Sequence, residues 1–195
     1  MKIFGAIGLN GSGKDEVVKY LQREYNVSFV SVGDIVREIA REKGVSPTRE
    51  NLHKISEERI RKFGKEHFMS LIIEGIEKNG WRTAGITGIR TPEDVHYLKN
   101  RFNGDFVLLH VFVGDASIRY ERTHKRAKAR DPQTYHAFLE QDREEEKMFN
   151  IDKASSMADY FLDNSKSLEN LHRQIDDIIE IGNFGLEKVK NQRCR

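Results

Sequence analysis

The strongest indication of the fold is the segment Gly8-Leu9-Asn10-Gly11-Ser12-Gly13-Lys14-Asp15. It has the Gly-x-x-x-x-Gly-Lys spacing of a phosphate-binding loop, or P-loop. Such a loop needs glycines because successive backbone N–H groups must point inward around a phosphate, while the lysine reaches the β- and γ-phosphates. We therefore expect ATP to be bound by Gly8, Asn10, Gly11, Ser12, Gly13, Lys14 and Asp15.

The sequence on either side of this loop supports the interpretation. An apolar run over residues 3–8 precedes it and predicts a strand, and Val17, Val18, Leu21 and Tyr25 follow it at helical spacing. A strand before the loop and a helix after it are the context that the motif requires, and the helix would point its positive end at the phosphates. The alternative is a flexible glycine turn between a strand and a helix.

Short apolar runs alternate with longer, charged, helix-periodic stretches along the rest of the chain. The runs that predict strands cover residues 3–8, 28–32, 83–87, 106–113 and 159–162. This alternation is typical of βα units around a mostly parallel sheet. We expect an α/β protein with the P-loop NTPase fold, in which helices flank a five-stranded, mostly parallel sheet.

A long helical segment separates the second and third predicted strands. One helix is expected over residues 34–43, with Asp34 as its N-cap and Gly44 as its stop, and another to begin at Ser46-Pro47-Thr48. With a further helix over residues 67–78, the connection is far longer than a simple crossover needs. We therefore predict an inserted helical subdomain over residues 34–80.

Length and composition limit the kind of protein that this is. The 195 residues suit one domain with a full core, which we expect over residues 1–182, followed by a polar C-terminal tail over residues 183–195. The net charge of +2 gives no argument for a nucleic-acid polymer as a partner. Cys194 is the only cysteine, which excludes an internal disulfide and fits a cytoplasmic protein. No stretch approaches the roughly 20 apolar residues of a membrane span, so no membrane partner is expected.

Asp15 departs from the usual P-loop, which has a serine or threonine that binds Mg²⁺ at this position. A carboxylate about 4 Å from a phosphate would cost about 4 kcal/mol at an effective dielectric of about 20, so a metal ion between the two groups is expected. The third strand usually supplies an aspartate to the same metal, yet here it ends at Thr87. One hypothesis is an exchange, in which Asp15 supplies the carboxylate and Thr87 the hydroxyl to Mg²⁺. The other is a loss of metal affinity.

Two segments beyond the P-loop resemble adenylate kinase and its relatives. After the second predicted strand, Ser31-Val32-Gly33-Asp34-Ile35-Val36-Arg37-Glu38 is similar to the Gly-Asp-x-x-Arg segment that opens their monophosphate-binding helix. After the third, Gly88-Ile89-Arg90-Thr91-Pro92 is similar to the turn that holds their acceptor phosphate. The resemblance implies that the acceptor is bound by Gly33, Asp34, Arg37 and Arg90. Planar guanidinium groups suit this role, because each can donate two parallel hydrogen bonds.

The basic segment over residues 116–130 resembles the lid of the same kinases, and we expect the lid region over residues 119–147. Its arginines are spaced three, four and four residues apart, so they would share one helical face: Arg119, Arg122, Arg126 and Arg130. The resemblance implies that the first two bind ATP, one of them by stacking on adenine, and that the last two neutralise the transferred phosphoryl group. The alternative is a solvated face with ion pairs to the acidic stretch that follows.

The resemblance implies an ATP-dependent phosphotransferase that uses Mg²⁺ with ATP. The expected acceptor is a small nucleotide-like molecule, a nucleoside or deoxynucleoside monophosphate. Lys14 and Arg90 join Arg126 and Arg130 as predicted catalytic residues. No general base is needed, because the acceptor is already an anionic phosphate that needs only alignment and charge stabilisation.

Two other functions stay open at this point. Dephospho-coenzyme A kinase has an aspartate followed by x-x-Arg-Glu after its second strand, which Asp34, Arg37 and Glu38 match, and Asp34 would then take the proton from a hydroxyl acceptor. The unusual Asp15 and Thr87 also fit a non-catalytic module that binds ATP to set its conformation. The Gly-Lys-Asp ending of the loop, however, resembles that of phage-type deoxynucleotide kinases. The whole pattern is similar to a little-characterised group of P-loop proteins related to adenylate kinase.

Overall fold

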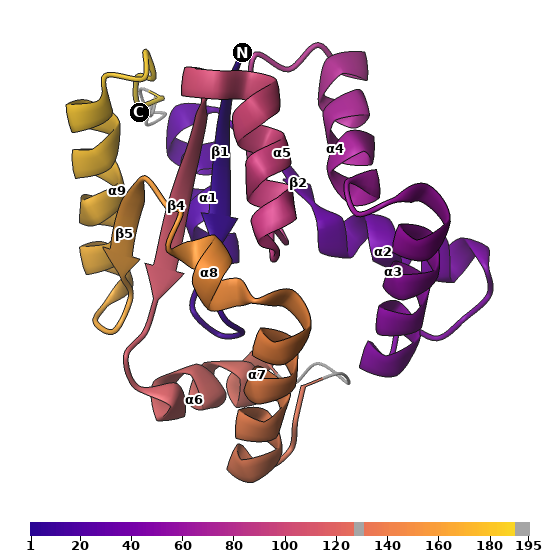
Figure 1. Ribbon diagram of the computed structural model, residues 1–195. Coiled ribbons are helices and arrows are strands. Elements are labelled where there is room, and N and C mark those ends of the chain that lie inside the picture. Colours follow the sequence, from indigo (N-terminus) through magenta and orange to yellow (C-terminus); the bar gives the residue numbers. More distant parts are fainter. Residues whose placement is uncertain (127–130, 190–195) are drawn as a thin grey trace, which may run out of the picture.

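Five parallel strands form the central sheet, in the order β2-β3-β1-β4-β5 (Figure 1). The computed structural model describes residues 1–126 and 131–189. The strands are β1 (Lys2–Ile7), β2 (Ser28–Ser31), β3 (Thr83–Thr87), β4 (Phe106–Phe112) and β5 (Tyr160–Asp163). The prediction of an α/β fold with a five-stranded parallel sheet is confirmed, because buried parallel strands read as short apolar runs.

Helices cover both faces of this sheet. They are α1 (Lys14–Tyr25), α2 (Val32–Glu42), α3 (Arg49–Phe63), α4 (His67–Lys78), α5 (Pro92–Phe102), α6 (Ala116–Arg126), α7 (Tyr135–Phe149), α8 (Ile151–Ser155) and α9 (Leu168–Gly182), with a short 3₁₀ turn at Asn103–Asp105. Buried side chains of α1 and α9 pack on one face, and those of α4, α5 and α8 pack on the other. Figure 1 shows α6 and α7 beyond the edge at which β1 and β4 end, and α2, α3 and α4 to one side.

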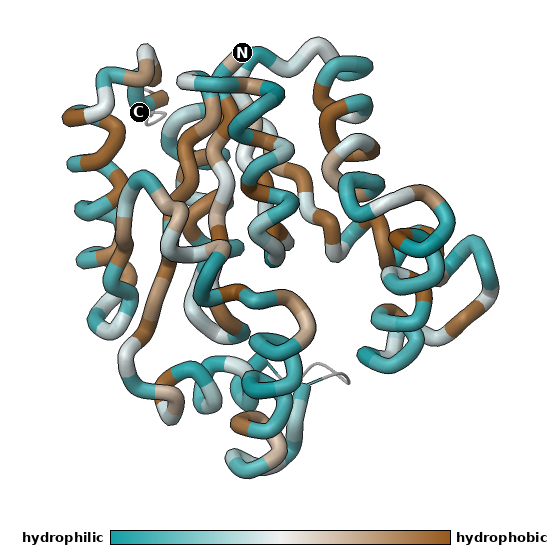
Figure 2. Tube along the Cα trace, in the orientation of Figure 1, coloured by the Kyte–Doolittle hydropathy of each residue, from teal (hydrophilic) through white to brown (hydrophobic). Residues whose placement is uncertain are grey.

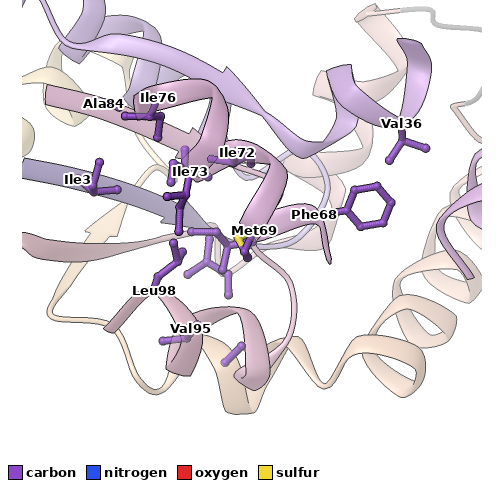
Figure 3. Close-up of a cluster of buried hydrophobic side chains, with 14 of the residues drawn as sticks. Ile3, Val36, Phe68, Met69, Ile72, Ile73, Ile76, Ala84, Val95 and Leu98 are labelled. Atoms are coloured by element: carbon purple, nitrogen blue, oxygen red, sulfur yellow. The ribbon is translucent and has the colours of Figure 1, made fainter. Parts of the chain in front are cut away.

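The core on the α4 face explains why the helical insertion stays attached to the sheet. Apolar residues of α4 recur at helical spacing and are buried: Phe68, Met69, Ile72, Ile73 and Ile76. In Figure 3 the last four lie among Ile3, Ala84 and Leu98 of the neighbouring elements, whereas Phe68 lies toward Val36 of α2. Burial of each such side chain stabilises the fold by about 1.5–3 kcal/mol. The hydropathy colouring in Figure 2 shows that the strands are largely apolar, whereas α6 and α7 are largely polar.

The topology places the P-loop at the centre of the sheet. β1 pairs with β3 on one side and with β4 on the other, so the chain leaves β1 toward β2 and β3 first and crosses to β4 later. Connections that diverge on the two sides of a strand leave a crevice at its carboxyl end, where α/β proteins bind ligands. The loop between β1 and α1 lies at that crevice.

The start of α2 differs from the sequence prediction. The helix begins at Val32 with Ser31 as its N-cap residue, so the prediction that Asp34 is the N-cap is wrong. Asp34 lies within the first turn, where an acidic side chain is favourable, and it pairs with Arg37 one turn later at 2.5 Å. The predicted stop at Gly44 is confirmed, since this glycine has a left-handed φ of 66° directly after the helix.

The start of α3 and the end of the chain also differ from expectation. Thr48 caps α3 by accepting a hydrogen bond from the Asn51 backbone N–H, so Pro47 precedes the helix and does not open it. Residues 183–189 are not simply a polar tail, because Phe184 packs edge-on against Phe4 of β1 at 5.4 Å between ring centroids. The packed domain therefore extends past residue 182. Within the described residues, no helix combines the length and the apolar character that crossing a bilayer would require.

Candidate nucleotide and acceptor site

The P-loop takes a conformation that only glycine adopts easily. Gly11 and Gly13 have φ values of 77° and 100°. A Cβ on Gly11 would lie 2.5 Å from the Arg119 carbonyl oxygen, and one on Gly13 would lie 2.2 Å from the Asn164 side-chain nitrogen. The glycines are thus required by close packing of α6 and of the loop after β5, as well as by the turn itself. The Lys14 ammonium folds back and donates to the Leu9 carbonyl oxygen at 3.3 Å.

A cavity of about 630 Å³ joins the P-loop to the ends of β2 and β3. It brings together eight of the sixteen residues that the sequence singled out: Asn10, Lys14, Asp15, Gly33, Arg37, Thr87, Arg90 and Arg126. Seven others are not among its lining residues, and Arg130 lies outside the described residues; the seven are Gly8, Gly11, Ser12, Gly13, Asp34, Arg119 and Arg122. The predicted P-loop and acceptor segments, although far apart in the chain, therefore face one space.

The lining of the cavity carries an excess of positive charge beside an apolar wall. Eight of the lining residues are lysine or arginine and four are aspartate or glutamate. The apolar wall comes from α2, α3, α4 and α7 and includes Val36, Leu52, Ile60, Phe68, Met69 and Phe149. Such a lining suits an anionic ligand that also has a flat, apolar part.

Asp15 and Thr87 both line the cavity, at the start of α1 and the end of β3. Thr87 is 1% exposed, and its hydroxyl oxygen is buried without a hydrogen-bond partner among the described residues. A buried hydroxyl is normally satisfied, so this one fits a ligand of the cavity, such as a hydrated metal ion. The described residues hold no cluster of three or more His, Cys, Asp or Glu side chains, so a Mg²⁺ ion here would take most of its oxygens from phosphates and water.

Arg37 lies at the acceptor side of the cavity, on α2. Its guanidinium pairs with Asp34 and passes over Gly33, where a Cβ would lie 3.2 Å from one of the guanidinium nitrogens. Gly33 therefore leaves room for the arginine, and Asp34 orients it from the solvent side, where the aspartate side chain is 63% exposed.

Arg90 is held by three separate features of its surroundings. Gly88, with φ of 91°, turns the chain after β3, and the Arg90 backbone N–H donates to the Asp94 carboxylate at 3.1 Å. Asp94 also forms the capping box of α5 with Thr91. Burial raises the pKa of Asp94, although these hydrogen bonds oppose the rise. The Arg90 guanidinium in turn lies over the Phe149 ring, 4.9 Å from its centroid.

The arginines of α6 have different partners, although they share a helix face. Arg119 is buried, pairs with Asp142 of α7 at 2.6 Å and donates to the Asn10 carbonyl oxygen at 3.1 Å. Arg122 donates to the Asn164 carbonyl oxygen at 2.8 Å. Arg126 makes two hydrogen bonds to Asp131, of 2.9 and 2.7 Å, and lines the cavity. The first two arginines thus fasten α6 to the P-loop and to the loop after β5, and do not form a solvated face.

Two further residues of the site, Arg49 and Glu145, were not identified from the sequence, and a third, Asn164, makes a contact that the sequence did not indicate. Asn164 donates from its side chain to the Ser12 carbonyl oxygen at 2.8 Å, which fixes the P-loop from the β5 side. Arg49 of α3 lines the cavity, and Glu145 of α7 is buried and pairs with it. The place of Asn164 directly after a predicted strand is a sequence signal for a site residue. Arg49 and Glu145 have no such signal, because they lie in charged helical stretches where burial cannot be recognised.

Comparison with known proteins supports the fold and gives the family. A family model described as AAA domain matches residues 7–138. The UPF0200 protein of Thermococcus onnurineus (strain NA1) is 30% identical over 177 residues, which cover 89% of this chain and 94% of that relative. The UPF0200/UPF0201 protein of Archaeoglobus fulgidus is 31% identical, over 92% of this chain and 55% of that relative.

Solved structures of small-molecule kinases are similar in fold. A sugar kinase from Janibacter sp. HTCC2649 aligns with a TM-score of 0.57 and 15% identity, over 93% of this chain and 95% of that one. A shikimate kinase from Aquifex aeolicus vf5 aligns with a TM-score of 0.55 and 20% identity, over 94% of this chain and 99% of that one. At such identities the likeness shows the fold alone. The family model and the relatives go further: this chain belongs to the UPF0200 family and carries an AAA domain over residues 7–138.

Proposed function

We propose that this chain is an ATP-dependent phosphotransferase that moves the γ-phosphoryl group of ATP to a nucleoside or deoxynucleoside monophosphate. The observation that carries the proposal is that one cavity of about 630 Å³ is lined by Lys14 and Asp15 of the P-loop and also by Arg37 and Arg90. A donor phosphate and an acceptor phosphate bound by these two pairs of residues would share one space.

The chemistry requires positioning and charge stabilisation. In the proposed complex, the backbone N–H groups of the P-loop and Lys14 hold the β- and γ-phosphates of ATP, and Arg37 and Arg90 hold the acceptor phosphate. Arg126 faces the same cavity and stabilises charge on the transferred group. Asp15 and Thr87 would hold Mg²⁺ supplied with ATP, and the ion would neutralise negative charge on the phosphates. The apolar wall near Phe149 suits the base of the acceptor.

A hydroxyl acceptor, as in dephospho-coenzyme A kinase, has less support. It would require Asp34 as the general base, yet this side chain is 63% exposed, pairs with Arg37 and is not among the residues that line the cavity. The non-catalytic alternative leaves the second cluster of cations, at Arg37 and Arg90, without a ligand. A phosphate acceptor gives these arginines a ligand without requiring a base.

The test is a panel of nucleoside and deoxynucleoside monophosphates and dephospho-coenzyme A, each supplied with ATP and Mg²⁺ while ADP release is followed. We expect acceptor-dependent ADP release with at least one monophosphate. Arg37→Met should raise the KM for that acceptor by about tenfold or more, whereas Arg41→Met, on the exposed side of the same helix, should not. Asp34→Asn should only weaken turnover of a phosphate acceptor, but it should nearly abolish turnover of a hydroxyl acceptor. Absence of acceptor-dependent ADP release across the panel would contradict the proposal.

A further inference from the structure

Glu145 of α7 is a buried carboxylate that contacts two other parts of the molecule. It is 3% exposed, and its Oε1 atom accepts a hydrogen bond from the Asn10 side chain of the P-loop at 3.2 Å. The same oxygen pairs with the guanidinium of Arg49, the first residue of α3 in the helical insertion. One carboxylate on α7 thus joins the P-loop and the helical insertion.

The contacts of Glu145 belong to a longer pattern on α7. Phe138, Asp142, Glu145 and Phe149 are spaced four, three and four residues apart, so they lie on one side of the helix, which we call the inner face of α7. Each of them contacts an arginine: the first two contact Arg119, Glu145 contacts Arg49, and Phe149 contacts Arg90. The inner face of α7 therefore contacts two arginines that line the cavity, Arg49 and Arg90, and a third, Arg119, that does not.

Glu145 stands out among these residues because of its burial and charge. A carboxylate excluded from water is stabilised only while its cationic partner stays in place, and loss of either partner leaves an uncompensated buried charge. The buried pair therefore favours the arrangement in which α3 lies against α7. Arg49 also lines the cavity, so this arrangement places its guanidinium where an anionic ligand can reach it.

We propose that Glu145 is a positioning residue, which holds Arg49 and the insertion beside the P-loop, and that Arg49 there binds the anionic group of the acceptor. The assignment of Arg49 rests on the proposed function, whereas the positioning by Glu145 does not. Because Asn10 and Arg49 share the Glu145 carboxylate, the position of the insertion is tied to the conformation of the P-loop. Ligands at the two ends of the cavity therefore influence each other's affinity reciprocally.

The positioning role can be tested on the full chain without any ligand. Nitroxide labels on cysteines placed at the exposed positions Lys54 of α3 and Lys147 of α7, in a Cys194→Ser background, report the distance between these helices by pulsed electron paramagnetic resonance.

We expect one narrow distance distribution in the parent protein and a broadened or longer one in Glu145→Gln. Arg49→Met should give the same change, and Glu144→Gln, an exposed neighbour with the same change of charge, should give none. Thermal unfolding of each variant shows that it folds. Unchanged distributions in Glu145→Gln and Arg49→Met would overturn the proposal.

Kinetics test the second half of the proposal with the acceptor that gives the highest rate in the panel. Both Glu145→Gln and Arg49→Met should raise the acceptor KM by about tenfold or more, and the double variant should be no worse than either single variant, because the two residues act as one unit. Additive effects in the double variant, or an unchanged KM, would contradict a shared role. If the unmodified protein turns over no acceptor, the proposed function fails, while the ligand-free distances still decide whether Glu145 holds the insertion.

Discussion

The Arg90 guanidinium lies 4.9 Å from the centroid of the Phe149 ring, so a residue of the turn between β3 and α5 contacts the last residue of α7. The aromatic face attracts the cation and restricts its orientation. His53 of α3 meets the edge of the same ring, with 6.2 Å between the ring centroids. Phe149 thus contacts Arg90 and the helical insertion together, so the proposed binding of the acceptor should depend on the position of α7.

Replacement of Phe149 by leucine should weaken acceptor binding selectively. Leucine keeps the apolar bulk but lacks the aromatic face, and a cation–π contact is worth about 0.5–2 kcal/mol. We expect an increase of about twofold to thirtyfold in the acceptor KM with little change in the affinity for ATP. Phe161→Leu, at an exposed position on β5, is the matched control. Equal effects of the two substitutions would show that the contact with Arg90 is unimportant.

Two glycine-to-alanine substitutions should have opposite effects on stability. Gly13→Ala places a methyl group 2.2 Å from Asn164 in a left-handed conformation, so it should lower the free energy of unfolding by more than about 1 kcal/mol and weaken ATP binding. Gly75 lies within α4 with no atom near the added methyl group, so Gly75→Ala should raise the free energy of unfolding by about 0.5–1 kcal/mol. Chemical denaturation measures both changes. A stabilising Gly13→Ala would refute the packing argument for the P-loop.

Asp15 and Thr87 provide a test of the metal hypothesis. If they exchange the usual positions of the carboxylate and the hydroxyl, Asp15→Ser should reduce Mg²⁺-dependent turnover by about tenfold or more, because the metal loses its one anionic protein group at this place. The double variant Asp15→Ser with Thr87→Asp should recover much of that loss. The readout is turnover as a function of Mg²⁺ concentration. A double variant as inactive as the single one would end the exchange hypothesis.

The protonation of His53 should contribute to the pH dependence of stability. Burial lowers the pKa of this histidine below its ordinary value of 6.5, and Arg49 and Arg90 lower it further. The unfolded chain therefore binds a proton at a higher pH than the folded chain does, so the free energy of unfolding should fall as the pH drops from about 7 to about 5.5. In His53→Gln this fall should be smaller, since one titrating group is gone. If the free energy of unfolding falls equally with pH in both proteins, this assignment of His53 is wrong.

The sheet and the position of the P-loop could be predicted from the sequence, because their signals are local. Each predicted strand lies within one residue of the observed one, since a buried parallel strand reads as a continuous apolar run. Lys14, Arg37 and Arg90 line one cavity, as the P-loop spacing and the resemblance of the segments after the second and third strands to adenylate kinase imply.

The contacts of the inner face of α7 could not be predicted from the sequence. Glu145 lies in the run Arg143-Glu144-Glu145-Glu146, and the sequence does not show which glutamate of this run is buried. Only tertiary packing selects Glu145 for burial, since Glu144 is exposed. Arg119 was identified, but its orientation toward Asp142 and the Asn10 carbonyl depends on how α6 packs on the P-loop.

The proposed function requires that one cavity hold two phosphates in line, one in the P-loop and one between Arg37 and Arg90. A crystal structure with a non-hydrolysable ATP analogue, Mg²⁺ and the best acceptor of the panel tests this binding. We expect the β- and γ-phosphates to accept hydrogen bonds from the backbone N–H groups of residues 8–14, and the acceptor phosphate to contact both arginines. An empty P-loop, or an acceptor phosphate bound away from Arg37 and Arg90, would contradict it.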